Sequence, residues 1–147
     1  MIEEERFQEL VAEAWEQVPA AWRRNVENVA LLVEDEPSAQ VREEEKLGPH
    51  DTLLGLYHGV PNTARGEGYG VGAIVPDTIT LFRLPILEEA RHHMRAEPHD
   101  AHTSEAFELI VRTVIQETLW HEIGHYFGLS EQEIDEREQE GTNQFES

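Results

Sequence analysis

The sequence predicts a single domain, residues 1–147, that is built from both α-helices and β-strands. Apolar residues recur at helical spacing near the N-terminus and again in the segment before residue 126. Short segments rich in valine, leucine and isoleucine lie between these two helices and are bounded by glycine, proline and acidic residues. A chain of 147 residues has the length of one domain with a modest core.

The first predicted helix covers residues 4–18 and stops before Pro19, because its apolar side chains follow the helical repeat. Strands are predicted at residues 26–33, 53–57, 71–75 and 78–82, the last two joined by a tight turn at Pro76-Asp77. The segment 38–50 is polar and acidic and contains Gly48-Pro49, so we expect a loop there.

Three more helices are expected in the C-terminal half. Pro85 favours the first turn of a helix over residues 86–95. A longer helix begins at Thr103 or Ser104, either of which can cap it, and carries an apolar stripe down to residue 125. A final helix is predicted near residues 131–140.

The long helix ends in the pattern His121-Glu122-x-x-His125. Positions i and i+4 share one face of a helix, so both imidazoles could bind one metal ion, with Glu122 beside them to move a proton. That arrangement is typical of zinc metalloproteases. The chain has 8 histidines and many glutamates, so the bare pattern could arise by chance, but Gly128 three residues later makes a chance match much rarer. The alternative is a histidine pair at the core edge without metal, whose ring nitrogens would then need other partners.

Catalytic zinc usually has three protein ligands and one position open to water, so a third ligand must lie outside the motif turn. Gly128 can adopt a left-handed conformation that ends the helix and turns the chain back. Glu131 would then come within reach of the metal. Ser130 and Glu133 also form a capping box, in which Glu131 would serve the helix dipole instead. The alternatives for the third ligand are Glu133 and Asp135.

The composition excludes several function classes. A net charge of −20 argues against binding to nucleic acids or to anionic membrane surfaces, and it disfavours acidic substrates. The acid excess also has a simpler interpretation as solvated helix surface. Without cysteine there is no disulfide or thiolate chemistry. An acidic N-terminus without an apolar region, and no apolar run of about 18 residues, lead us to expect a cytoplasmic protein.

These residues together resemble the zincin metallopeptidases, and specifically the small bacterial minimal zincin family, over most of the chain. The pattern H-E-x-x-H-x-x-G-x-x-acid carries the resemblance with two further segments, which are Leu54-Gly55-Leu56-Tyr57-His58-Gly59 and Pro76-Asp77-Thr78-Ile79-Thr80-Leu81-Phe82-Arg83. Members of the family typically have aspartate at the third ligand position, where this chain has Glu131. The chain also differs from the larger metzincins, because its only methionines are Met1 and Met94 and no Met-turn can follow the motif.

The resemblance implies an α+β, zincin-like fold in which a small mixed sheet packs on the helix that carries the motif. It also implies a Zn²⁺ site formed by His121, His125 and Glu131, with Glu122 as the catalytic base, and hydrolysis of a peptide or protein substrate. The alternative function is a non-catalytic, zinc-stabilised binding module of the same fold. We expect Tyr57, His58 and Tyr126 to be structural rather than oxyanion-stabilising, and the histidines outside the motif to lie on the surface or in loops, namely His50, His92, His93, His99 and His102.

Overall fold

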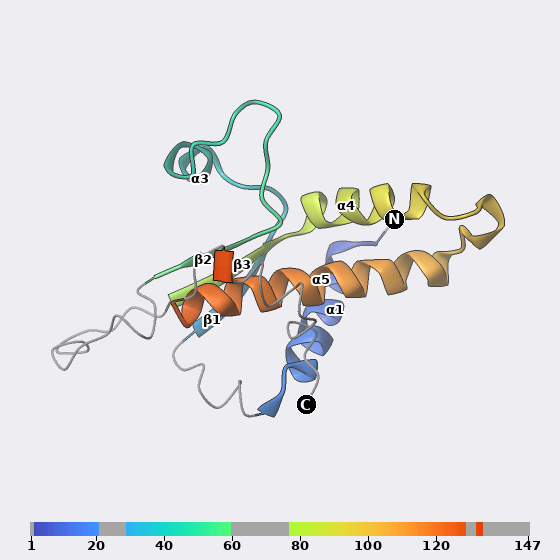
Figure 1. The fold of residues 1–147 in the computed structure, drawn as a ribbon, viewed down its shortest axis with the longest axis horizontal. Helices are drawn as coiled ribbons and strands as arrows, with labels where there is room; N and C mark the ends of the chain where they lie inside the picture. The colour runs from blue at the N-terminus through green and yellow to red at the C-terminus, as the bar shows by residue number, and fades with distance from the viewer. Residues whose placement is uncertain (1, 21–28, 60–76, 129–131, 134–147) are drawn as a thin grey trace, which may run out of the picture.

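The computed structural model describes residues 2–20, 29–59, 77–128 and 132–133. Figure 1 shows a long helix, α5, with α4 along one side and α1 along the other, next to a small sheet. The elements occur in the order α1 (Glu4–Gln17), β1 (Val29–Glu34), α3 (Ala39–Glu44), β2 (Gly55–His58), β3 (Asp77–Phe82), α4 (Arg83–Arg95), the 3-10 turn η2 (His99–Ala101) and α5 (Ser104–Tyr126).

The described strands form a three-stranded sheet in the order β1-β3-β2. β1 pairs with β3 in parallel, from Val29 opposite Asp77 onward, and β2 pairs with β3 antiparallel, with Gly55 opposite Leu81. The central strand β3 is buried along almost its whole length. Helices and a small mixed sheet are therefore present, as the α+β prediction requires.

The core is organised around α5. This helix packs against α1, α4, β2 and β3, and it is the element that all four share. Its completely buried side chains are Val111, Ile115, Leu119, Ile123 and Tyr126. α1 contributes Phe7 and Leu10 to the same cluster, and α4 contributes Ile86, Leu87 and Ala90. Apolar burial on several sides therefore fixes the position and the rotation of α5.

Two predicted helix ends are confirmed, and a third differs from the prediction. The hydroxyl of Thr103 accepts a hydrogen bond from the backbone N–H of Ala106 at 3.1 Å and caps α5, as expected. α1 ends at Gln17, just before Pro19. α4 begins at Arg83, three residues earlier than predicted, so Pro85 lies inside its first turn, where a missing N–H breaks no helical hydrogen bond.

The prediction of a loop over residues 38–50 was partly wrong, because α3 occupies residues 39–44. The Ser38 hydroxyl accepts from the Val41 N–H at 3.2 Å and caps this helix. α3 buries no residue, so hydrophobic periodicity could not indicate it. The second strand begins at Gly55 and extends to His58, two residues later at its start than predicted.

Asp77 was also predicted wrongly as a turn residue. It is the first residue of β3 and is only 3% exposed. The predicted strand at 71–75 and the first residues of the strand at 26–33 lie outside the described residues. Of the last predicted helix, only residues 132–133 are described, and their backbone is helical.

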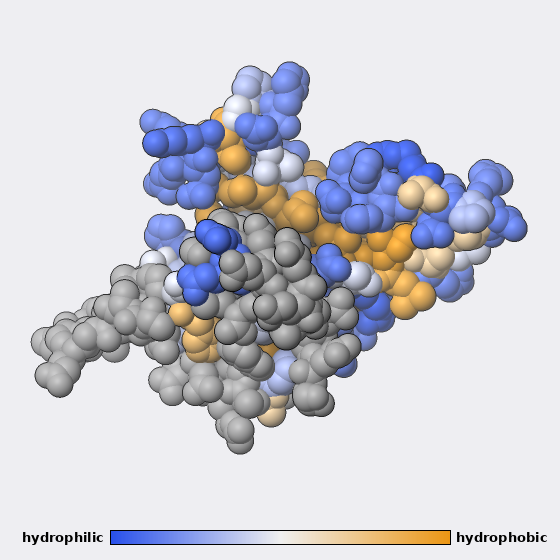
Figure 2. Space-filling model, in the orientation of Figure 1, coloured by the Kyte–Doolittle hydropathy of each residue, from blue (hydrophilic) through white to orange (hydrophobic). Residues whose placement is uncertain are grey.

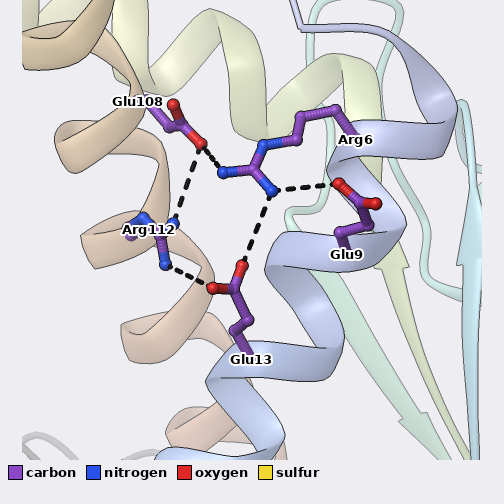
Figure 3. A network of polar contacts seen from close by, with 5 residues as sticks. All are labelled: Arg6, Glu9, Glu13, Glu108 and Arg112. Atoms are coloured by element: carbon purple, nitrogen blue, oxygen red, sulfur yellow. Dashed lines mark hydrogen bonds and ion pairs between the residues drawn. The ribbon is translucent and has the colours of Figure 1, made fainter.

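A network of ion pairs joins α1 to α5 on the protein surface (Figure 3). Arg6 of α1 pairs with Glu9 and Glu13 on its own helix and with Glu108 on α5. Arg112 of α5 returns to Glu13 at 3.3 Å. Hydrogen bonds to Glu9 and Glu108 raise the pKa of the Arg6 guanidinium. Two of the few cations in this acidic chain therefore neutralise carboxylates where the two helices meet.

The surface in Figure 2 is hydrophilic over α3 and over the outer side of α4, and an apolar strip lies beneath them along α5. No helix in the described part of the chain combines the length and the apolar character that a membrane crossing requires.

The packing of α1 on α5 gives a first prediction. Phe7 is completely buried in the core, so Phe7→Ala should lower the free energy of unfolding by about 3–5 kcal/mol in urea titrations. Gln8→Ala changes the exposed neighbour on the same helix and should shift stability by less than about 0.5 kcal/mol. Equal effects of the two substitutions would contradict the placement of α1 in the core.

Candidate metal centre and cleft

The last two turns of α5 place His121, Glu122 and His125 together. Both histidines are half-buried, and their ring centroids lie 5.0 Å apart, as the i and i+4 positions of one helix face require. The apolar stripe leading to them ends with the buried residues Val114 and Thr118. The two imidazoles therefore lie at the boundary between the core and the solvent.

Gly128 has the left-handed conformation that the sequence predicted, with a φ of 82°. Its N–H donates to the carbonyl of His125 at 2.9 Å. A left-handed glycine directly after a helix is a common way to stop it and redirect the chain. The turn after the motif is thus of the kind that could bring a later residue back toward the histidines.

The identity of the third ligand stays a prediction. Glu131 and Asp135 lie outside the described residues, and Glu133 is exposed. Among the residues that the structure describes, no group of three or more histidine, aspartate or glutamate side chains is arranged to hold a metal ion. Two imidazoles on one face, with a carboxylate beside them, nevertheless fit the donor types that zinc prefers.

A cleft of about 810 Å³ opens in front of the motif. β2 and the residues before it form one wall, and α5 forms another, with Glu89 and His93 of α4 and Glu45 at the end of α3 also contributing. The wall residues of α5 are Val114, Glu117, Thr118, His121, Glu122 and His125. None of the described lining residues is a lysine or an arginine, so the cleft has the same negative character as the whole chain.

β2 lies directly against α5 because it begins with a glycine. A Cβ atom on Gly55 would lie 2.7 Å from the Thr118 side chain and 3.2 Å from the Thr80 carbonyl. Two residues along β2, the backbone N–H of Tyr57 donates to Glu122 Oε1 at 2.8 Å. Strand and helix are therefore in fixed register, with Gly55 beside Thr118 and Tyr57 beside Glu122.

The side chain of Tyr57 has its own anchor. Its hydroxyl donates to Asp77 Oδ2 at 2.7 Å, and its ring meets the buried ring of Tyr126 edge-on at 6.0 Å. Gly59 passes so close to Asp77 that a Cβ atom on it would lie 2.4 Å from the carboxyl carbon, and its φ is 152°. No local sequence pattern indicates this cluster, because its members meet only through contacts between segments that are distant in sequence.

The remaining histidines are exposed in the structure, as the sequence suggested. His93 differs from the other exposed histidines because it also lines the cleft, and it pairs with Glu89 at 3.2 Å. His58 is exposed at the end of β2. These positions leave the motif histidines as the half-buried pair among the described residues.

A family model described as zincin-like metallopeptidase matches residues 26–141 of the chain. The matched range runs from before β1 to beyond α5, and so includes the motif and all three candidates for the third ligand, while α1 lies outside it. No curated protein matches the chain.

The contact between Gly59 and Asp77 gives a second prediction. Gly59→Ala forces a side chain into a positive-φ position and against a buried carboxylate, so it should lower the free energy of unfolding by about 2 kcal/mol or more. Gly48→Ala is the matched control, because its Cβ would meet only the flexible Asp51 side chain, and it should change stability by less than about 1 kcal/mol. Thermal and urea unfolding measure both, and an unaltered stability of the Gly59 variant would refute the close approach.

Proposed function

Because the chain belongs to the zincin-like metallopeptidases, we propose that it is a zinc-dependent peptidase that cleaves peptide bonds in the cleft between α5 and β2. The observation that carries this proposal is the position of Glu122. Its carboxylate lies between the two histidines of the motif in sequence, lines the cleft, and is hydrogen-bonded to the strand that forms the opposite wall. The candidate base, the two candidate zinc ligands and the strand that would bind the substrate therefore lie together in one cleft.

His121 and His125 would hold the zinc ion through their ring nitrogens, with Glu131 as the proposed third ligand. The chemistry that a bound zinc ion supplies is Lewis-acid catalysis, which acidifies a water molecule and polarises the scissile carbonyl. The half-buried position of both histidines supports this role, since each is partly covered by the protein and also lines the cleft.

Glu122 would act as general base and then as general acid. It takes a proton from the attacking water and later delivers it to the leaving amine. The residue is only 7% exposed but lines the cleft, so its carboxylate is held with little freedom while facing the substrate. A proton-transfer group needs this kind of fixed placement within hydrogen-bonding reach.

A peptide substrate would bind as an added strand along β2. The N–H of Phe82 donates to the carbonyl of Leu54 at 2.9 Å, so alternate residues of β2 face β3. In an antiparallel pair the intervening residues, Gly55 and Tyr57, direct their backbone groups away from β3. The Tyr57 N–H accordingly points to the cleft side, where it donates to Glu122, and the same antiparallel pattern directs the carbonyls of Gly55 and Tyr57 away from β3. Among the described strands β2 is paired only with β3. The acidic lining of the cleft favours neutral or basic peptides over acidic ones.

Glu122→Gln separates an enzyme from a zinc-stabilised binding module. The amide keeps an oxygen that can accept from the Tyr57 N–H but cannot take a proton, so zinc content should stay the same while hydrolysis falls by about a hundredfold or more. Glu105→Gln, at the exposed start of the same helix, is the matched control and should retain activity. The assay uses zinc-loaded protein and a peptide library with acidic, neutral and basic members. If the wild type cleaves none of them, the peptidase proposal fails and the binding-module alternative stands.

The ligand set is tested by zinc affinity. His121→Ala and His125→Ala should each lower the affinity by about a hundredfold or more, since a catalytic zinc has only three protein ligands. Glu131→Ala should lower it comparably, whereas Glu133→Ala and Asp135→Ala should not. His93→Ala removes a histidine from the same cleft and serves as the control. An unchanged affinity in Glu131→Ala would eliminate Glu131 as a ligand.

A further inference from the structure

Two hydrogen bonds connect the candidate base to a buried aspartate. Tyr57 donates through its backbone N–H to Glu122 Oε1 at 2.8 Å, and through its side-chain hydroxyl to Asp77 Oδ2 at 2.7 Å. Asp77 on β3 lies 20 positions after Tyr57 in the sequence, and Glu122 on α5 lies 65 positions after it, whereas Tyr57 itself is on β2. One tyrosine therefore ties the carboxylate of α5 to the start of the central strand.

The direction of the Tyr57 N–H depends on the local rotation of β2. The register places Tyr57 opposite Ile79 in a pair whose backbone groups point away from each other, so no bond to β3 fixes this amide. The strand is short, with only four residues, and ends one residue later. The pairs of Leu56 with Thr80 and of His58 with Thr78 hold the strand on either side, and what holds the Tyr57 side chain restricts the rotation that remains at Tyr57 itself.

Asp77 is suited to hold it. The carboxylate is 3% exposed, and a buried carboxylate is tolerated only where hydrogen bonds satisfy it. Gly59 closes around it, with room for no Cβ atom. The edge-on contact with Tyr126 restricts the tyrosine ring from the other side. The Tyr57 side chain is thus held at its hydroxyl by Asp77 and along its ring by Tyr126.

We propose that Asp77 and Tyr57 are positioning residues for Glu122: the buried Asp77 carboxylate fixes the Tyr57 side chain, which in turn aims the Tyr57 amide at the base. This inference rests on the proposed peptidase function. Neither side chain is assigned contact with the substrate or the reacting atoms. Their contribution is to hold the Glu122 carboxylate in place before a substrate arrives, which spares the ordering of a flexible glutamate during the reaction.

Hydrogen exchange of the Tyr57 amide, read by NMR, tests the positioning without any activity assay. Glu122→Ala should speed the exchange of this amide by about tenfold by removing its acceptor. Tyr57→Phe, which removes only the hydroxyl, should also speed the exchange of the residue 57 amide by about tenfold. Asp77→Asn in the Tyr57→Phe background should add little, because the two groups act through one bond. The Phe82 amide, which bonds to Leu54, is the internal reference and should change by less than about twofold if the effect is local.

Asp35→Asn is the matched control, because it weakens the ion pair between Asp35, just after β1, and Arg83 at the start of α4, and it should leave the Tyr57 amide unchanged. In zinc-loaded protein, Tyr57→Phe should lower kcat by about tenfold with unchanged metal content and a smaller change in KM.

Slow exchange of the residue 57 amide in Tyr57→Phe, together with fast exchange in Glu122→Ala, would overturn the role of the phenol. Slow exchange in both would overturn the contact itself. A wild type without activity would reject the peptidase function alone, and the exchange result would still decide whether the pair positions Glu122.

Discussion

The site depends on the direct contact between β2 and α5. Gly55 has no side chain, so the strand can lie against Thr118, and this contact fixes which residues of strand and helix face each other. Two residues further along β2 and four further along α5, the register brings Tyr57 to Glu122. A larger residue at position 55 would push the strand away from the helix. The distance between the β2 wall of the cleft and the motif therefore depends on Gly55, a residue without a functional side chain.

Rigidity of α5 follows from its packing. α1 and α4 cover it on two sides and the sheet covers a third, so the helix cannot rotate without opening the core. His121 and His125 stand where the apolar stripe of this helix leaves the core. Their placement on a buried helix, rather than on a loop, holds two potential ligands in a fixed relation, as metal sites require.

The sequence predicted what local patterns encode. Helical periodicity and the Thr103 cap placed α5, and the i and i+4 spacing correctly put His121 and His125 on one face. The left-handed Gly128 was likewise predictable from its position after a helix. α3 was missed because it buries no residue and so lacks a periodic apolar face, although Ser38 was an available capping signal.

Long-range contacts were beyond such patterns. Asp77 follows a proline and was interpreted as a turn residue, but pairing with Val29 of β1 makes it the first residue of β3. Its bond to Tyr57, and that of Tyr57 to Glu122, join residues from three elements, and nothing in any one segment indicates them. The resemblance to the minimal zincins rested on the same segments without explaining why they belong together. The structure supplies that reason, since residues 54–59 and the motif helix form two walls of the cleft, and β3 holds the first of these segments through strand pairing.

On the proposed function, the cleft beside α5 is a zinc site that is open to substrate. A crystal structure of the zinc-loaded protein would decide this. We expect one zinc ion, bound by ring nitrogens of His121 and His125 at about 2.0–2.1 Å, with one coordination position facing the cleft. Zinc bound elsewhere on the chain, or bound at the motif by four protein ligands with no open position, would contradict it.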